Sequence, residues 1–418
     1  MLDLRSLPID PDRVQARIDQ LGAIGVHPNG GLFRTLYDDG WVEAMALLRR
    51  WMEEAGLSVR FDAVGNLWGR AEGTGRGPGY ANAVVTGSHV DTVRQGGKYD
   101  GALGVHMAIA AVQALLEGVG RPKRPLEVLV TCEEEGSRFA CSFWGARAIV
   151  GRVGADEPDR IADPDGVTIG AAMRERGFDP ARIGEAERHD LAAFVEAHIE
   201  QGAILEREGY PLGVVTSITG QRWIQVTVDG IQNHAGTTPM DLRQDALAGA
   251  ATMIARIEAA ALAMGRPAVA TVGRIQALPG GTNIIPGRCT FTVDSRHAEF
   301  GPRQQLLAEI EKIIRETARE RGLDVTIQTV MDHDPVPMSQ EIRAQIEASI
   351  QSLGLQYLVM PSGAGHDSEI LAPRVPTAML FVPSKGGKSH TPEELTPVEW
   401  VVPGIQALAG ALHRLAYA

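Results

Sequence analysis

Four short apolar runs in this chain each end in histidine or acidic residues, and this repeated pattern constrains the fold more than any other feature. The first run covers residues 83–85 and is followed by His89 and Asp91. Apolar runs of this length are typical of buried strands in an α/β sheet. Open α/β sheets bind ligands beyond the carboxyl ends of such strands. The pattern therefore predicts an α/β fold with a polar site along one edge of its sheet.

The polar residues at these strand ends are those that bind divalent metals. A second aspartate, Asp100, opens a helical pattern over residues 103–116. Imidazole and carboxylate groups ligate zinc, manganese or cobalt. Adjacent carboxylates repel one another unless cations or protons neutralise them, so a metal site and a solvated acidic edge are the two alternatives. The other three runs and their polar residues are 126–132 with Glu133, Glu134 and Glu135, 194–199 with His198 and Glu200, and 377–383 with His390.

Composition narrows the class of protein. A chain of 418 residues is long enough for two domains. The net charge of −12 argues against a nucleic-acid or anionic-membrane partner. Three cysteines without a Cys-X-X-Cys pair favour buried thiols in a reducing cytosol. With no signal-peptide pattern and no run expected to reach membrane-spanning length, we expect a cytoplasmic protein that does not enter a membrane.

The block between the third and fourth strand ends has a different predicted order of strands and helices. Its order is β-α-β-β-α-β, which is typical of a ferredoxin-like unit. Since His390 follows this block and the other candidate ligands precede it, the block is predicted to be an insertion. The expected boundaries are 1–213 and 334–418 for the catalytic domain and 214–333 for the insertion. The predicted elements are strands 222–231, 268–276, 289–295 and 324–330 and helices 245–264 and 304–321.

Six short motifs contain or adjoin the candidate residues. They are Gly-Ser-His-Val-Asp-Thr, Tyr-Asp-Gly, Glu-Glu-Glu-Gly-Ser-Arg-Phe, His-Ile-Glu-Gln-Gly, Asn-His-Ala-Gly-Thr-Thr-Pro and Ser-His-Thr-Pro. Taken together, these motifs resemble those of the dinuclear-metal amidohydrolases related to aminoacylase and the dinuclear exopeptidases. The branch resembled contains N-carbamoyl-L-amino acid hydrolase, allantoate amidohydrolase and β-ureidopropionase, and the likeness spans residues 14–416.

The resemblance implies a fold and two metal ions. The expected core is metallopeptidase-like, with a central mixed sheet flanked by helices, and the insertion is a lid and dimerisation domain. Two divalent ions (Zn, Mn, Co or Ni) are implied, with Asp100 as the bridge between them. His89 and His198 would bind one ion, and Glu135 and His390 the other. Dipeptidase relatives usually have an acid in place of His198, and this departure marks the carbamoylase branch.

The resemblance also implies the catalytic groups. Glu134 is the expected general base, because a carboxylate beside activated water can take its proton and return it to the leaving nitrogen. Asp91 is expected to orient His89 by hydrogen bonding to the far imidazole nitrogen. His234 would stabilise the developing oxyanion. Glu133 has no assigned role.

Five residues are expected to contact the substrate. Arg296 suits a carboxylate because its guanidinium can bond both oxygens. Asn283 would bind polar groups of the substrate, and His366 is placed near the scissile group. By position alone each of these could be an ordinary loop residue, so the assignment depends on the resemblance. The five residues are Gln201, His234, Asn283, Arg296 and His366.

The function expected from these features is hydrolysis of the ureido C–N bond of an N-carbamoyl-L-amino acid, giving the amino acid, ammonia and carbon dioxide. The alternatives are an allantoate amidohydrolase, a β-ureidopropionase, a dipeptidase or aminoacylase, and a metal-bearing binding protein without turnover. Intact Glu134 argues against the last of these. The expected partners are a small ureido acid and a second copy of the chain, bound through the inserted domain.

Overall fold

The computed structural model describes residues 2–418, which form two compact units. Unit 1 contains the chain up to Thr216 together with Pro337–Met360 and Ala364–Ala418. Unit 2 contains Ser217–Val336 and Pro361–Gly363. Unit 2 is thus an insertion between two long segments of unit 1.

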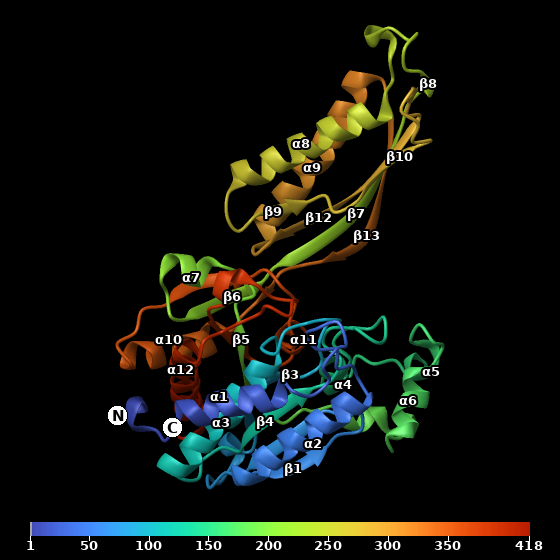
Figure 1. The fold of residues 1–418 in the computed structure, drawn as a ribbon. Coiled ribbons are helices and arrows are strands. Elements are labelled where there is room, and N and C mark those ends of the chain that lie inside the picture. Colours follow the sequence, from blue (N-terminus) through green and yellow to red (C-terminus); the bar gives the residue numbers. More distant parts are fainter. Residues whose placement is uncertain (1) are drawn as a thin grey trace. The chain divides into compact units, whose positions relative to one another are not determined.

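A mixed sheet of nine strands forms the centre of unit 1 (Figure 1). Its order is β1-β2-β4-β3-β5-β16-β6-β14, with β15 paired to β6. The middle strands β4, β3, β5 and β16 run parallel, and every residue of β3, β4 and β16 is buried. Burial on both faces explains why these strands are continuous apolar runs. The strands are β1 Ser58–Phe61, β2 Leu67–Ala71, β3 Ala83–His89, β4 Leu126–Thr131, β5 Leu191–Ile199, β6 Gly213–Ile218, β14 Val336–Pro337, β15 Leu358–Ser362 and β16 Thr377–Val382.

Helices cover both faces of this sheet. Successive strand residues point to opposite faces, so Ser88, which α3 approaches, and Val85, which packs with α4, lie on different sides. Helices α3, α12, α1 and α10 pack together on the first side, and α4 and α11 lie on the other. The helices are α1 Pro11–Leu21, α2 Asp39–Glu54, α3 Ala102–Gly118, α4 Trp144–Ile149, α5 Glu157–Arg160, α6 Ile169–Glu175, α7 Ile204–Glu208, α10 Gln340–Ser352, α11 Asp367–Leu371 and α12 Val398–Ala416.

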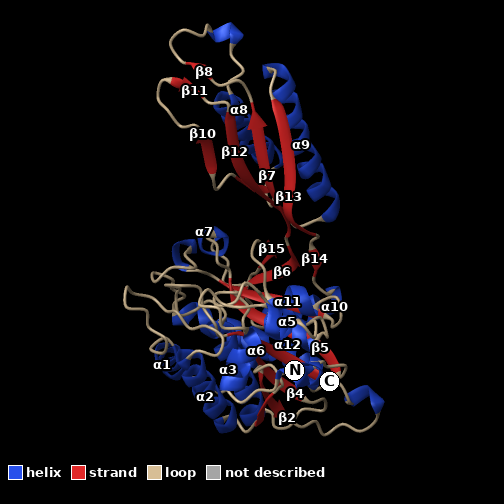
Figure 2. Ribbon diagram, turned by 90° about the vertical axis from the view of Figure 1, so that its right-hand side faces the viewer, coloured by secondary structure: helices blue, strands red, loops and turns tan. Residues whose placement is uncertain are grey.

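Unit 2 is an antiparallel sheet with two helices on one face (Figure 2). The order is β10-β12-β7-β13, and β9 also pairs with β12. Its own core includes Val226, Met253, Phe291 and Ile314. The strand predicted over residues 268–276 is interrupted, because only its two ends pair with β12. The elements are β7 Gly220–Asp229, β8 Asn233–His234, α8 Ala246–Met264, β9 Val269–Thr271, β10 Ile275–Leu278, β11 Ile284–Ile285, β12 Arg288–His297, α9 Phe300–Arg321 and β13 Asp324–His333.

Helix α8 corrects one expectation from the sequence. Among the described residues, it is the one helix long and apolar enough to meet the length and composition requirement of a membrane span. The sequence analysis expected no such run. Met253 and Ile257 of this helix belong to the core of unit 2, as in a helix that packs on a sheet. The Ala-rich composition explains both properties, since alanine is apolar and favours helix.

Candidate metal centre and active site

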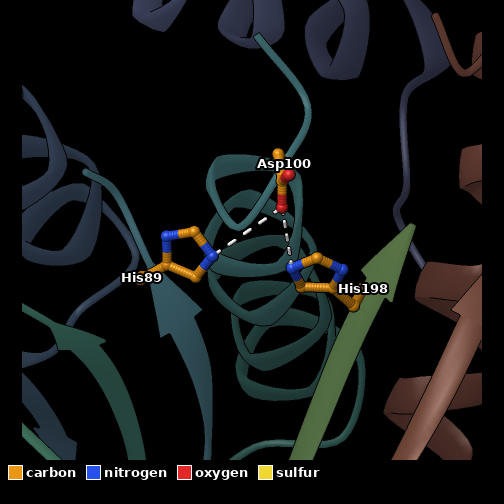
Figure 3. Close-up of side chains that lie close together, drawn as sticks. All are labelled: His89, Asp100 and His198. Atoms are coloured by element: carbon orange, nitrogen blue, oxygen red, sulfur yellow. Dashed lines mark ion pairs between the residues drawn. The ribbon is translucent and has the colours of Figure 1, made fainter. Parts of the chain in front are cut away.

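Two histidines from neighbouring strands face one aspartate in unit 1 (Figure 3). His89 ends β3, His198 lies near the end of β5, and Asp100 comes just before α3. Nε2 of His198 lies 3.3 Å from Oδ1 of Asp100, and Nε2 of His89 lies 3.8 Å from the same oxygen. All three residues are buried. The parallel strands bring these residues together, since their carboxyl ends share one edge of the sheet.

The other oxygen of Asp100 faces a second group. Nε2 of His390 lies 3.1 Å from Oδ2 of Asp100 and 3.5 Å from Oε1 of Glu135. His390 lies in the loop after β16 and Glu135 in the loop after β4. Asp100 therefore directs one carboxylate oxygen to each of two clusters, which is the arrangement that a bridging ligand requires.

The ring orientations of His89 and His198 suit metal binding. Nδ1 of His89 lies 3.1 Å from the carbonyl oxygen of Asp91, and Nδ1 of His198 lies 2.9 Å from that of Ile199. A carbonyl accepts only from an N–H, so Nδ1 of each ring carries a proton and Nε2 is the nitrogen that faces Asp100. Histidines that bind metals are usually held in this way by a carbonyl or carboxylate.

The pKa shifts in this cluster show that its carboxylates require neutralising positive charge. Burial, followed by the charge of Asp100, raises the pKa of Glu135 to about 8. Despite burial, hydrogen bonds from His198 and His390 hold the pKa of Asp100 well below its usual range. Despite burial, the bond to Asp100 raises the pKa of His198 to about 9, and a bond to Asp100 does the same for His390. These protons stand where cations would otherwise neutralise the carboxylates, so metal binding should release them.

The donor set fits divalent metals. Each candidate group brings three His or acidic ligand atoms within 4.8 Å of one another. Atoms that bind one zinc ion at about 2.0–2.2 Å stand roughly 3–4 Å apart, which matches the separations around Asp100. The described groups are His89 with Asp100 and His198, Asp100 with Glu135 and His390, His89 with Glu134 and Glu135, and Glu196 with His198 and His366.

Asp91 contacts both His89 and the acidic loop after β4. The contact of His89 is with the carbonyl of Asp91, and the nearer carboxylate oxygen lies 3.7 Å from Nδ1. The carboxylate instead accepts the backbone N–H groups of Glu134, at 3.2 Å, and Glu135, at 3.0 Å. Asp91 thus fixes the His89 ring through its backbone and the acidic loop through its side chain.

Glu133 and Glu134 have separate environments. The buried Glu133 carboxylate accepts the N–H groups of Leu36, Arg138 and Phe139, so it holds the loop that presents its neighbours. Its φ of +54° lies in the left-handed region, which costs free energy for a residue with a side chain. Glu134 is buried with Oε2 3.9 Å from Nε2 of His89. Burial, followed by the charge of Glu135, raises its pKa well above the usual range.

Gln201 and His366 lie within the same cluster. Nε2 of Gln201 donates to Oδ2 of Asp100 at 2.8 Å, so this amide contacts a candidate ligand. The buried His366 ring packs edge-on against His198, with centroids 4.5 Å apart. Burial, followed by the charge of His198, holds its pKa well below the usual range. A neutral His366 beside His198 is suited to supporting the ligand shell.

Three expected substrate residues belong to unit 2. His234 and Asn283 lie at the small β8–β11 ribbon, where Ala235 N–H donates to the Asn283 carbonyl. Nδ1 of His234 accepts the N–H groups of Gly236 and Thr237. The His234 proton is therefore on Nε2, which leaves that nitrogen as a hydrogen-bond donor at an exposed position.

Arg296 on β12 is already paired. Its Nη2 lies 2.8 Å from Oδ2 of Asp294, and its Nη1 donates to the carbonyl of Gly363. Gln221 is directly opposite on β7 and donates to the same Asp294 carboxylate at 3.1 Å. The sequence analysis did not single out Gln221, although cross-strand pairing with Arg296 places its amide in the same cluster.

Two buried acids of unit 1 were also missed. Asp367 directly follows His366 and accepts a hydrogen bond from Thr131. Burial, followed by the charge of Glu196, raises its pKa well above the usual range. Glu394 lies four residues after His390 and binds the backbone of Asp100. The position of Asp367 beside His366 was an available signal, whereas the contacts of Glu394 are with backbone N–H groups and left no signal in the sequence.

Comparison with known proteins identifies the family. The model of peptidase family M20/M25/M40 matches residues 85–414. The chain belongs to this family. The chain is accordingly a metal-dependent amidohydrolase, as its resemblance indicated.

Individual relatives refine this M20 assignment. The chain is 40% identical to an allantoate amidohydrolase of Escherichia coli (strain K12), over 97% of this chain and 98% of that protein. It is 38% identical to an N-carbamoyl-L-amino-acid amidohydrolase of Pseudomonas sp. (strain NS671), over 97% and 98%. A crystal structure of a hydantoinase/carbamoylase family amidase from Burkholderia multivorans matches with a TM-score of 0.93, 34% identity and 99% coverage of both chains. The family resemblance is confirmed, and ureido compounds are the substrate class these names share.

Proposed function

We propose that this protein hydrolyses the ureido C–N bond of an N-carbamoyl-L-amino acid, giving the amino acid, ammonia and carbon dioxide. The observation that carries the proposal is the division of Asp100 between two donor groups, with the buried Glu134 beside them. Asp100 would bridge two metal ions, with His89 and His198 on one and Glu135 and His390 on the other. Histidine at position 198 supports the carbamoylase branch over a dipeptidase.

The chemistry divides among the chain's own residues. Bound divalent ions would polarise the ureido carbonyl and make water more acidic. Glu134 accepts a proton from the attacking water and passes it to the departing nitrogen as the C–N bond breaks. His234 donates from Nε2 to the oxygen that gains negative charge, which is the role its tautomer permits. The carbamic acid left after this cleavage loses carbon dioxide and frees the second nitrogen. One water thus supplies the oxygen and one proton for each nitrogen, and the reaction needs no further reactant.

Substrate recognition would depend on the polar groups of unit 2. Arg296 and Asn283 would bind the carboxylate and neighbouring polar atoms. Asp294 already neutralises part of the Arg296 charge, so the arginine would act by its remaining N–H groups. An arginine that is already paired is better suited to a hydrogen bond of defined geometry than to the general attraction of anions.

Allantoate is the second candidate substrate. Two relatives named allantoate amidohydrolase, from Escherichia coli and Bacillus subtilis, are each 40% identical to this chain. Allantoate also carries a carboxylate and ureido groups, so the same residues would serve it.

A substrate panel tests both candidates. Purified protein reconstituted with manganese or zinc is assayed for ammonia release on carbamoyl amino acids, allantoate and 3-ureidopropionate, and for amino-acid release on dipeptides. Faster turnover of carbamoyl amino acids supports the first proposal, and preference for allantoate replaces it with the second. Turnover of dipeptides alone would reject both.

The role of Arg296 is tested with a matched substrate pair. Wild type and Arg296→Ala are compared on a carbamoyl amino acid and on its carboxamide. Removing Arg296 takes away the N–H groups proposed to bind the carboxylate, so we expect the wild type to prefer the acid and the variant to lose most of that preference. An unchanged preference would mean that another group binds the carboxylate.

We also propose a cytoplasmic homodimer formed through unit 2. Leu262, Val269, Ile275 and Leu278 are exposed along α8 and the β9–β10 side of the sheet. An unpaired strand edge with exposed apolar side chains is suited to an isologous contact. Light scattering should give twice the chain mass, and an active monomer at micromolar concentration would reject the dimer.

The buried thiols of Cys132, Cys141 and Cys289 are free, as expected in a reducing compartment.

A further inference from the structure

One buried acid of unit 1 has no part in the proposed reaction, yet it binds the backbone of the proposed bridging residue. Oε1 of Glu394 accepts the N–H of Tyr99 at 2.8 Å and the N–H of Asp100 at 2.9 Å. Glu394 is 5% exposed, whereas its neighbour Glu393 is exposed and pairs with Lys388. Two consecutive amides on one oxygen define the position and direction of the peptide that carries the Asp100 side chain.

The other oxygen of Glu394 reaches the Asp100 carboxylate through a serine. The Ser389 hydroxyl lies 3.1 Å from Oε2 of Glu394 and 3.0 Å from Oδ2 of Asp100. The amide of Gln201 also donates to Ser389, at 3.2 Å, and to Oδ2 of Asp100. A hydroxyl has one proton to donate, so Ser389 can bond only one of the two carboxylates at a time. Glu394 thus influences both ends of Asp100, its backbone and its side chain.

Glu394 packs closely against the loop that bears Asp100. A Cβ added at Gly97 would lie 2.4 Å from Cβ of Glu394 and 2.4 Å from its Oε1. Any side chain at position 97 would therefore displace the glutamate. Along the chain, the loop that bears Asp100 precedes the unit 2 insertion and the loop that bears His390 follows it. Glu394 joins these two loops.

We propose that Glu394 is a positioning residue for the metal centre, which holds Asp100 so that each of its oxygens faces one metal position. The inference rests on the proposed function, since it assumes two metal ions bridged by Asp100. It predicts that the acceptor geometry of Glu394 matters more than its charge. Residues that orient metal ligands typically change metal affinity by about 10–100-fold when they are removed.

Two substitutions at this position separate geometry from charge. Glu394→Gln keeps an oxygen for the two N–H groups, and its amide can donate to Ser389, which then donates to Asp100. We expect it to keep both metals with affinities within about threefold of wild type. Glu394→Ala leaves both N–H groups without an acceptor and should weaken metal binding at least about 10-fold. Ser389→Ala removes only the side-chain link and should give an intermediate loss, so it serves if Glu394→Ala does not fold.

The experiment measures metal binding directly. Each protein is stripped with a chelator and titrated with Mn²⁺ or Zn²⁺ by calorimetry, and kcat and KM are then measured at limiting and excess metal. Glu393→Ala is the matched control, one residue away and exposed, and should behave as wild type. For Glu394→Ala, excess metal should restore kcat while KM stays near the wild-type value.

The outcomes distinguish the two proposals. If the wild type binds two ions and Glu394→Ala or Ser389→Ala binds them equally tightly, the positioning role is wrong and the proposed function stands. If Glu394→Gln loses metal as severely as Glu394→Ala, charge and not acceptor geometry is what matters, which also overturns the inference. A wild type that binds no metal would reject the metal centre itself, and the proposed function with it.

Discussion

Glu134 is held by its backbone, since its N–H bonds to Asp91, while its side chain faces His89. Glu134→Gln removes the proton acceptor and preserves the shape of the side chain. We expect kcat to fall at least about 10²-fold, the lower range for general acid–base catalysis, while both metals remain bound. Steady-state kinetics and elemental analysis of the same preparation check this. Near-normal kcat in a fully metal-loaded variant would assign the base to another residue.

His106 provides a test of stability against pH away from the metal centre. Its buried ring packs on Trp51, and burial, followed by the charge of Arg17, lowers its pKa to about 3. Below about pH 6.5 the unfolded imidazole gains a proton that the folded one does not, so this residue reduces stability as the pH falls. By pH 5 the loss amounts to about 2 kcal/mol.

The substitution His106→Gln removes this titration. The difference in unfolding free energy between pH 8 and pH 5, measured by denaturant titration, should therefore be smaller than in wild type. The exposed His189→Gln is the control and should leave the pH dependence unchanged. An identical pH dependence in His106→Gln and wild type would contradict the assigned pKa.

For single residues, the sequence predicts those that follow apolar strand patterns. It misses residues whose role shows only in their three-dimensional contacts. His89, Asp100, His198 and His390 follow apolar runs, so their type and position could be anticipated, and the structure brings them together. Glu394 binds backbone N–H groups, which carry no residue-specific signal. Asp91 was expected to orient His89; its backbone carbonyl makes that contact, while two amides of a loop distant in sequence bind its carboxylate.

Among the elements, helix α3 packs closely against β3 and β5 because of one glycine. A Cβ at Gly104 would lie 2.1 Å from the carbonyl oxygen of Ala197 and 2.9 Å from Cβ of Ser88. Gly104→Ala should push α3 away from β5, next to His198. Overpacking costs about 1–3 kcal/mol, which exceeds the gain of about 1 kcal/mol in helix propensity.

Thermal unfolding and metal titration check this prediction, which expects both a lower Tm and weaker metal binding. The matched control is Gly301→Ala near the start of α9, where nothing lies within 4 Å of the added atom. It should leave the Tm unchanged or slightly raised. If Gly104→Ala matches Gly301→Ala in Tm, α3 has room to adjust and the close approach is not required.

Buried strands and amphipathic helices were predictable because their apolar periodicity follows from burial. The break between β9 and β10 was not. Residues 268–276 are apolar enough for one strand, but this side of the sheet is an edge, so register there depends on pairing with β12 alone. The glycine at position 273, between the two short strands, was the available signal.

For the whole molecule, the two units should respond differently to metal removal. The candidate ligands all belong to unit 1, and unit 2 has a separate core. Ligand binding stabilises the state that binds, by about 2.7 kcal/mol at a metal concentration 100-fold above Kd. Calorimetry is run with and without a chelator. The chelator should lower the unfolding temperature of unit 1 and leave that of unit 2 unchanged. A single transition that ignores the chelator would contradict this separation.

The position of β16 in the sheet has a consequence for how the protein is made. This strand pairs with β5 on one side and β6 on the other, yet the ribosome synthesises it only after the whole of unit 2. Until then the nascent chain presents β5 and β6 with unpaired edges, which are open to wrong pairing. Unit 2, whose strands and helices are contiguous in the chain, is free to fold during this interval. His390 and Glu394 emerge later still, so the full set of proposed ligands exists only once the catalytic unit has been translated, and the edges of β5 and β6 stay unpaired until β16 arrives.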